Sequence, residues 1–280
     1  MDGSALREFI QRSLAEDIGD GDHSSLACIP YEAGGKAKLL IKENGILAGV
    51  RVATEIFSVV DKDLKHEVLI RDGAEVNPGD IAFYISGPQR SILKSERLTL
   101  NIMQRMSGIA TATREYTEKL KGLKTMILDT RKTTPGFRFL EKEAVRIGGG
   151  INHRMGLYDM IMLKDNHIDY AGGIEKAILS THAYLRKNNL NLKVEIEARN
   201  IGEVRKILST GLVDRIMLDN FNVPDTLAAV KEISGRCETE SSGGITLATI
   251  RSYAECGVDF ISVGALTHHI KSLDMSLKAL

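Results

Sequence analysis

In the second half of the chain, side chains that can bind substrates or take part in catalysis directly follow short apolar runs. Basic residues follow two of these runs, carboxylates follow two others, and glycines with hydroxyl groups follow the last two. Basic side chains bind carboxylates and phosphates, carboxylates bind hydroxyl groups or hard cations, and glycines let backbone N–H groups approach a phosphate. The segments are 129–132, 164–167, 195–197, 219–220, 240–244 and 264–268. Their succession indicates a site for anionic substrates.

Residues 131–167 have a local excess of positive charge in a chain that is neutral as a whole. They hold seven basic side chains against four acidic ones, whereas the whole chain has 37 of each. An arginine fork suits bidentate capture of a carboxylate, and a lysine acts as a point charge. The basic residues are Arg131, Lys132, Arg138, Lys142, Arg146, Arg154 and Lys164, with His153 and His167 nearby. We interpret Lys142 and Arg146 as a solvated helix face, and Arg131, Lys132 and Lys164 as site residues because they directly follow strands.

Two glycine-containing loops near the C-terminus could bind phosphate. Residues 241–244 precede a helix that we expect to begin near Leu247, and residues 264–267 end another strand. A helix N-terminus attracts anions, and the last two loops of a parallel barrel often bind phosphate. The pair of loops therefore predicts a phosphate site.

Three carboxylates form the acidic part of the predicted site. Glu195 and Glu197 lie two apart on a strand, so their side chains point to the same side of the sheet. Buried carboxylates need partners, and we expect one of the two to pair with a buried cation. The other, together with Asp219, could bind ribose hydroxyl groups or Mg²⁺.

Short strands that alternate with helices must position these side chains. Such alternation is typical of parallel strand–helix units, and the number and spacing of the units favour a (β/α) barrel over an open sheet. In a barrel the carboxyl ends of the strands converge on one face, where barrel enzymes have their active sites. The expected strands are 125–128, 160–163, 194–197, 215–218 and 260–263, and the expected helices are 174–187, 201–210, 226–233 and 247–256.

The first part of the chain has a different pattern. Leu6, Phe9, Ile10 and Leu14 recur at helical spacing, which predicts a helix over 4–16. A small sheet should follow, and then a helix over 95–119 that buries a stripe of Leu98, Ile102, Met106 and Ile109. The strands expected in this sheet are 36–41, 46–53, 66–70 and 81–85, separated by Asn-Gly, Asp-Gly and Asn-Pro-Gly-Asp turns.

The bulk composition narrows the class of protein. Hydrophobic residues make up 43% and charged residues 26%, which is ordinary for a globular protein. The balanced charge gives no reason to expect nucleic acid or an anionic membrane as partner. Three scattered cysteines and the absence of a signal peptide or long apolar segment predict a cytoplasmic location.

The sequence lacks the motifs of nucleophilic hydrolases and zinc proteases. Neither Gly-x-Ser-x-Gly nor His-Glu-x-x-His occurs. Lys164 at a strand end could instead form a Schiff base with a carbonyl substrate. The arginine excess and the phosphate loops favour transfer chemistry between anions over that alternative.

These segments together resemble the quinolinate phosphoribosyltransferase family. The specific motifs are Asp-Thr-Arg-Lys-Thr-Thr-Pro-Gly at 129–136 and Asn-His-Arg at 152–154, in that order. Further similar stretches occur almost from end to end. They lie at 16–22, 101–111, 164–167, 194–197, 218–221, 242–244 and 264–268.

The resemblance implies the following fold and activity. An N-terminal α/β sandwich domain over 1–115, ending in the long helix, would precede an irregular (β/α) barrel over 116–280 with a helical C-terminal tail. The barrel would catalyse the Mg²⁺-dependent transfer of phosphoribosyl from phosphoribosyl pyrophosphate to quinolinate. The products would be nicotinate mononucleotide, pyrophosphate and CO₂, which serve de novo NAD biosynthesis.

The resemblance also implies roles for individual residues. Arg131, His153, Arg154 and Lys164 would surround the quinolinate dicarboxylate, and Arg105 would come from the partner subunit of a homodimer or larger oligomer. Lys132, Lys164, Glu197 and Asp219 would be catalytic, and Glu197 and Asp219 would hold Mg²⁺, directly or through water. Phosphoribosyl pyrophosphate or its metal would contact Lys132, Glu197, Asp219, Ser242, Gly243, Gly244, Gly264 and Ala265, and Thr130 and Leu266 would also bind substrate.

Three alternatives stay open at this point. A paralogue associated with molybdenum transport shares the Arg-Lys-Thr and Ser-Gly-Gly elements and the fold. A lyase that uses Lys164 for a Schiff base would be a different reaction. A non-catalytic dimeric protein would bind phosphoribosyl pyrophosphate without releasing CO₂.

Overall fold

The computed structural model describes residues 3–280, which form two compact units. The first unit consists of residues up to Arg114 together with Pro135–Gly149 and His269–Leu280. The second consists of Glu115–Thr134 and Gly150–His268. The first unit is therefore made of three separate stretches of chain.

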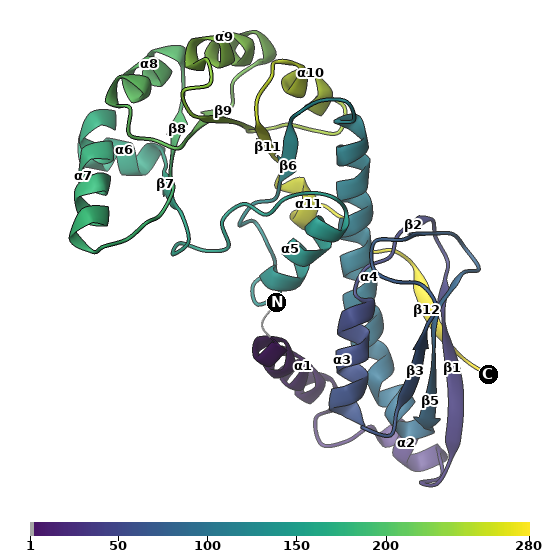
Figure 1. The fold of residues 1–280 in the computed structure, drawn as a ribbon. Coiled ribbons are helices and arrows are strands. Elements are labelled where there is room, and N and C mark those ends of the chain that lie inside the picture. The colour runs from purple at the N-terminus through teal and green to yellow at the C-terminus, as the bar shows by residue number, and fades with distance from the viewer. Residues whose placement is uncertain (1–2) are drawn as a thin grey trace. The chain divides into compact units, whose positions relative to one another are not determined.

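The first unit is built on an antiparallel sheet with the strand order β12-β1-β5-β3 (Figure 1). The strands are β1 (Gly34–Ile41), β3 (Lys65–Val68), β5 (Ile81–Pro88) and β12 (Met275–Ala279), and a separate small pair is β2 (Gly45–Ile46) with β4 (Glu75–Val76). In the central pairing, Ala37 of β1 lies opposite Ile85 of β5. Because side chains alternate along β1, Ala37, Leu39 and Ile41 are buried on one face of the sheet.

Two helices cover the buried face of this sheet, α3 (Val50–Val60) and α4 (Gln89–Lys119). The other helices of this unit are α1 (Gly3–Ile18), α2 (His23–Cys28) and α5 (Arg138–Ile147). The core joins helix to sheet, since Phe57 of α3 meets Phe83 of β5 edge to face at 5.5 Å, and Met103 of α4 belongs to the same cluster. The stripe expected on the long helix is buried as predicted. This is the expected α/β sandwich.

The second unit holds a parallel sheet with the order β6-β11-β10-β9-β8-β7. Figure 1 shows this sheet strongly curved, with its helices on the outer face. Residues 150–153 run beside the edge strand β6, where Ile151 pairs with Leu128. The strands are β6 (Met126–Leu128), β7 (Ile161–Leu163), β8 (Val194–Ala198), β9 (Arg215–Asp219), β10 (Glu238–Ser242) and β11 (Phe260–Ser262). The irregular (β/α) barrel is therefore confirmed.

The outer helices of this unit begin and end at local sequence signals. Asn200 and Asn222 accept the backbone N–H groups of Glu203 and Asp225, and so cap two helices. Gly211 adopts the left-handed conformation that ends a helix. The helices are α6 (Asp165–Ala171), α7 (Ile174–Lys187), α8 (Ile201–Thr210), α9 (Val223–Ile233), α10 (Ile250–Glu255) and α11 (Ala265–His268).

The strand predicted over 46–53 is wrong for most of its length. Pairing ends at Ile46, and helix α3 begins at Val50 after Gly49, whose φ is +97°. The carboxylate of Asp72 accepts the N–H groups of Val50 and Arg51 at 2.8 and 3.3 Å. This cap comes from a residue distant in sequence, and it stabilises a helix in a β-branched segment that favours a strand.

The prediction of a helical C-terminal tail is also wrong. After the short helix α11, residues Met275–Ala279 form strand β12, which pairs antiparallel with β1. Met275 and Leu273 are buried in the core of the first unit. Pairing and burial therefore outweigh any helical preference of this segment.

None of the helices within residues 3–280 is both long enough and apolar enough to cross a membrane.

Candidate active site

The carboxyl ends of the six parallel strands bring the predicted site residues of the second unit to one edge of the sheet. Parallel strands end on the same side, so residues that directly follow them become neighbours. Arg131 and Lys132 follow β6, Lys164 follows β7, and Gly264 follows β11. The other strands contribute Glu197 on β8, Asp219 at the end of β9, and Ser242 with Gly243 and Gly244 at the end of β10.

Lys132 and Gly264 lie side by side at the ends of β6 and β11. The hydroxyl of Thr267 donates to the carbonyl of Lys132 at 2.8 Å. The backbone N–H of Lys132 donates to the hydroxyl of Thr130 at 3.0 Å. A Cβ at Gly264 would lie 3.1 Å from the Lys132 side chain and 2.8 Å from the His268 ring. The sequence therefore needs glycine there to let the lysine stem pass.

The ends of β9 and β10 are joined by a backbone bond. Asn220 N donates to the Ser242 carbonyl at 2.8 Å, and the Asn220 side chain donates to the Asp219 carboxylate. Gly243 and Gly244 have φ values of +96° and +62°, a conformation that side chains other than glycine rarely adopt. Helix α10 begins only at Ile250, so the predicted helix start near Leu247, with its dipole next to this loop, is wrong. A turn over 247–249 separates the two.

Lys164 and Glu197 form an ion pair between the ends of β7 and β8. The Glu197 side chain is 9% exposed and the Lys164 side chain 45%. The second Glu197 oxygen accepts the Asp165 N–H at 3.3 Å. Lys164, which we expected at the dicarboxylate, is therefore in direct contact with Glu197, which we expected at the sugar phosphate.

Arg131 and Arg154 are close enough to repel each other. Burial lowers the pKa of Arg154, and the positive charge of Arg131 lowers it further, against the opposing effect of Glu195, Asp159 and Glu197. Arg154 also donates to the Met160 carbonyl at 3.3 Å. Two cations held near each other bind a dianion well, because the dianion relieves their repulsion.

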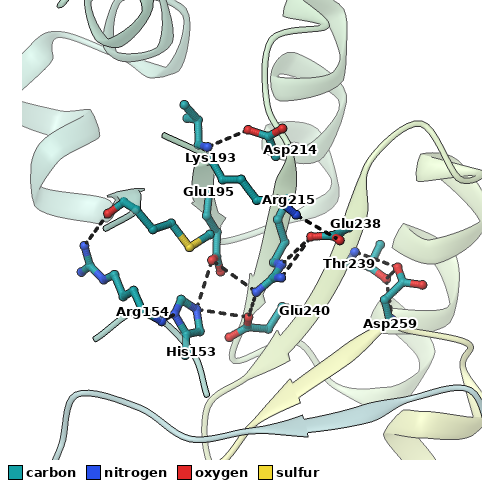
Figure 2. Close-up of polar contacts among 12 residues, drawn as sticks. His153, Arg154, Lys193, Glu195, Asp214, Arg215, Glu238, Thr239, Glu240 and Asp259 are labelled. Atoms are coloured by element: carbon teal, nitrogen blue, oxygen red, sulfur yellow. Dashed lines mark hydrogen bonds and ion pairs between the residues drawn. The ribbon is translucent and has the colours of Figure 1, made fainter. Parts of the chain in front are cut away.

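His153 faces a cluster of charged side chains inside the sheet (Figure 2). Its Nε2 lies 3.1 Å from Glu195 Oε2 and 3.4 Å from Glu240 Oε2, and its Nδ1 accepts the Arg154 N–H at 2.7 Å. The backbone N–H of His153 donates to the buried Asp129 carboxylate at 2.8 Å. Both ring nitrogens are therefore engaged within this unit.

Arg215 on β9 completes the cluster. Its guanidinium group lies 3.1 Å from Glu240 and 3.7 Å from Glu195, donates to Glu238, and stacks at 4.0 Å over the Phe260 ring. Glu195 thus pairs with a buried cation, as expected for one of the two glutamates on β8. We call His153, Glu195, Arg215 and Glu240 the interior charge cluster.

Two family models match almost all of the chain. Residues 22–107 match the N-terminal domain of quinolinate phosphoribosyl transferase, and residues 109–278 match its C-terminal domain. The chain belongs to the quinolinate phosphoribosyltransferase family.

Similar proteins of this family come from plants and bacteria. "Quinolinate phosphoribosyltransferase [decarboxylating] 1b" of Nicotiana tabacum is 47% identical over 98% of this chain and 82% of its own length. "Probable nicotinate-nucleotide pyrophosphorylase [carboxylating]" of Bacillus subtilis is 41% identical over 97% of this chain and 92% of its own. The crystal structure of NadC from Streptococcus pyogenes superimposes with a TM-score of 0.94, at 38% identity over 100% of this chain and 99% of that one.

Arg105 is the one residue of the predicted family site that lies in the first unit, within the described residues 3–280. It sits on α4, and its guanidinium group contacts the fully buried carboxylate of Glu141 on α5 at 2.6 Å. The neighbouring Lys142 is also fully buried, so its assignment to a solvated face is wrong. One face of helix α5 is buried, and Phe139 near its start packs on Phe9 of α1. Arg146 is exposed and pairs with Glu143, as a solvated face requires.

From the sequence we did not predict that Arg215 belongs to the interior charge cluster. We named Glu240 only as the first residue of a polar segment. The sequence did contain a pattern that indicates this ion-pair cluster. Arg215 pairs in register with Glu195 and Glu238, so the three side chains share one face of the sheet. Charged residues of opposite sign at matching positions of successive strands indicate a buried ion pair.

Proposed function

We propose that the protein catalyses the transfer of phosphoribosyl from phosphoribosyl pyrophosphate to quinolinate with decarboxylation. The products are nicotinate mononucleotide, pyrophosphate and CO₂. One observation supports this most strongly: a single edge of the parallel sheet combines cations for a dicarboxylate with glycine loops for a sugar phosphate. The family membership of the chain and the names of its relatives support the same reaction.

The dicarboxylate subsite consists of Arg131, Arg154 and Lys164. Their three positive charges exceed the charge of a dianion, and Glu197 balances the excess through Lys164. Arginine forks can hold each carboxylate through two hydrogen bonds, which fixes the orientation of the pyridine ring.

The phosphoribosyl subsite consists of Lys132, Asp219, the loop after β10 and the loop after β11. Backbone N–H groups at Gly243, Gly244, Gly264, Ala265 and Leu266 can approach phosphate oxygens, and Ser242 adds a hydroxyl group. Lys132 stabilises the charge that develops on the leaving pyrophosphate.

The donor set suits Mg²⁺ bound chiefly through substrate oxygens. Glu197 already contacts Lys164 and the Asp165 N–H, whereas Asp219 is half-buried and accepts from the Asn220 side chain through one oxygen, Oδ2. Mg²⁺ commonly binds one or two carboxylates together with phosphates and water. Asp219 would hold the ion and Glu197 would contact it through water. The bound ion would neutralise charge on the pyrophosphate.

The chain's own groups orient the reactants and stabilise charge. The ring nitrogen of quinolinate attacks C1 of the ribose as the bond to pyrophosphate breaks, and the sugar becomes cation-like. The carboxylates of Glu197 and Asp219 favour that positive charge. Once the nitrogen is quaternary, the adjacent carboxylate leaves as CO₂, and the carbanion beside N⁺ takes up a proton. No protein nucleophile is needed for these steps.

The test is incubation with quinolinate, phosphoribosyl pyrophosphate and Mg²⁺, followed by detection of nicotinate mononucleotide and CO₂. Formation of both products in equal amounts is the expected result. Binding of phosphoribosyl pyrophosphate without CO₂ release would instead indicate a binding protein or the molybdenum-transport paralogue. Trapping of Lys164 by borohydride with a carbonyl substrate would indicate a Schiff-base lyase.

We also propose a homodimer, or a larger oligomer, in which Arg105 of one subunit contacts the dicarboxylate bound by another. The location stays a prediction, since the names of plant relatives call them chloroplastic or mitochondrial. A cytoplasmic enzyme is our expectation from the sequence.

A further inference from the structure

The ring of His153 is turned toward the interior charge cluster. Its side chain is 4% exposed, and Nε2 points to two carboxylates that are fully buried. A backbone N–H can only donate, so the 2.7 Å contact with Arg154 N requires Nδ1 to be an acceptor. Against the effect of burial, Glu195 and Glu240 raise the pKa of His153 to about 9. A proton on Nδ1 would meet the Arg154 N–H, however, so this contact favours a single proton on Nε2.

Arg215 holds the two carboxylates together. Glu195 and Glu240 come from different strands and would repel each other in a buried site. The Arg215 guanidinium group lies between them, and its position is fixed by Glu238 and by the Phe260 ring. Figure 2 shows the guanidinium group between these carboxylates, with His153 on their other side. Removal of the arginine would leave two buried negative charges without a compensating cation.

The cluster is linked to the strand ends through Arg154. His153 Nδ1 accepts the Arg154 N–H, and the Arg154 guanidinium group leads away to the Met160 carbonyl (Figure 2). The His153 backbone is fixed independently by Asp129, which is fully buried at the end of β6. A displacement of the ring would therefore rotate the 153–154 peptide and shift the base of the Arg154 side chain.

We propose that Arg215 and Glu240 are positioning residues for the dicarboxylate subsite, and that His153 transmits their effect to Arg154. The inference rests on the proposed function, because it concerns the same subsite. The ion pairs of Arg215 and Glu240 go to Glu195, Glu238 and His153 and not to the glycine loops, so binding of phosphoribosyl pyrophosphate should depend on the cluster little.

Substitutions at Arg215 and Glu240 test the cluster itself. Arg215→Met and Glu240→Gln should raise the dissociation constant for quinolinate alone by about tenfold or more, a loss typical of a displaced charge-assisted contact. The KM for phosphoribosyl pyrophosphate should change by less than about twofold. Arg215→Lys should recover part of the affinity, because it keeps the charge and loses the fork. Arg205→Met is the matched control, since Arg205 forms an exposed pair with Glu232.

Two substitutions of His153 separate its two contacts. Asparagine can present an oxygen near the position of Nδ1 for the Arg154 N–H, and glutamine can reach the carboxylates but leaves that N–H without a ring acceptor. His153→Asn should therefore keep more quinolinate affinity than His153→Gln. The opposite order would overturn the inference.

A general loss of stability must be distinguished from positioning. Ile216→Val weakens the same strand, because Ile216 is fully buried beside Arg215. This variant should lower the melting temperature and leave quinolinate affinity unchanged. The inference fails if Ile216→Val loses quinolinate as Arg215→Met does, or if the cluster variants impair both substrates by the same factor. If Arg215→Met does not fold, Arg215→Lys and Glu240→Gln decide the question.

Imidazole ¹⁵N NMR tests the arrangement without any substrate. The wild-type protein should show His153 with a protonated Nε2 and an unprotonated Nδ1, and a protonated Nδ1 would refute the proposal. Wild-type protein that binds no quinolinate would refute the proposed function instead, and the NMR result would still report on the cluster.

Discussion

Arg131 and Arg154 show how residue type decides what this edge of the sheet can bind. Arg131 follows the first parallel strand, β6, and Arg154 follows the segment that runs beside it. The positive charge of Arg131 lowers the pKa of Arg154. An anion that binds between the two guanidinium groups relieves their mutual repulsion, which favours its binding.

Substitution of Arg154 should therefore affect quinolinate more than the fold. Arg154→Ala should lower kcat/KM for quinolinate by about 100-fold or more, because a charge-assisted fork to a desolvated carboxylate is lost. Arg154→Lys should restore only part of it. Steady-state kinetics with quinolinate varied, together with circular dichroism to confirm the fold, checks this. Normal kinetics in Arg154→Ala would remove Arg154 from the dicarboxylate subsite.

At the scale of elements, the loop after β10 is the most constrained part of the site. Gly243 has a φ of +96°, and a Cβ there would overlap the Asn220 side chain and lie 2.9 Å from Asn220 N. The loop therefore depends on contact with the end of β9. Gly244 has a φ of +62° and open space around it.

These two glycines give a matched pair of variants. Gly243→Ala should destabilise the protein by about 2 kcal/mol or more, since it combines backbone strain with a steric clash. Gly244→Ala should cost only about 1 kcal/mol, which is the strain alone. Urea unfolding measures the free energy of unfolding of both variants. The KM for phosphoribosyl pyrophosphate should rise more in Gly243→Ala than in Gly244→Ala. Equal effects of the two substitutions would mean that the contact with Asn220 is unimportant.

The elements also show what the sequence could and could not predict. The helices over 174–187 and 201–210 have the predicted bounds, because apolar spacing and caps agree there. Strand β10 was identified only from its polar end, since Glu238–Ser242 contains no aliphatic residue. Glu240 is fully buried and Glu238 half-buried, and they pair with His153 and Arg215, which lie 87 and 23 residues away from them. Helix α3 was missed for a similar reason, because its cap is Asp72. Interactions distant in sequence account for these errors.

The candidate site was more predictable than the fold around it. Residues that follow strands, such as Lys164 and Asp219, occupy a common edge once the strands are parallel. The sequence did not reveal that Lys164 would pair with Glu197, or that His153 would turn inward. Both depend on side-chain partners that local patterns do not specify.

At the scale of the whole molecule, the interior charge cluster makes stability depend on pH. Burial and the charge of Glu240 raise the pKa of Glu195 to about 7. The folded protein therefore keeps a proton that the unfolded chain releases at lower pH, so the unfolding free energy falls as pH rises through about 7.

The loss of stability between pH 5 and pH 8 that is due to Glu195 should be on the order of 2 kcal/mol. Urea unfolding at both pH values in wild type and in Glu195→Gln checks this. The difference between the two pH values should shrink in Glu195→Gln, because glutamine does not titrate. An unchanged difference would show that other groups cause the pH dependence.

The proposed oligomer gives a whole-molecule test of Arg105. Variants Arg105→Ala and Arg154→Ala should each be nearly inactive. A mixture that is unfolded and refolded together should recover about a quarter of wild-type activity, because half of the dimers are mixed and each has one intact site. No recovery would mean that Arg105 acts in its own subunit or not at all. Activity assays of the separate and mixed proteins measure this.

Strand β12 has a consequence for how the protein is made. The edge strand that covers β1 is formed by residues 275–279, which follow the whole second unit in the chain. During synthesis these residues emerge from the ribosome only after the entire parallel-stranded unit, so the sheet of the first unit is completed late. The unpaired edge of β1 is exposed meanwhile to other nascent chains, and chaperone protection of that interval would matter more here than in a protein whose first sheet closes early.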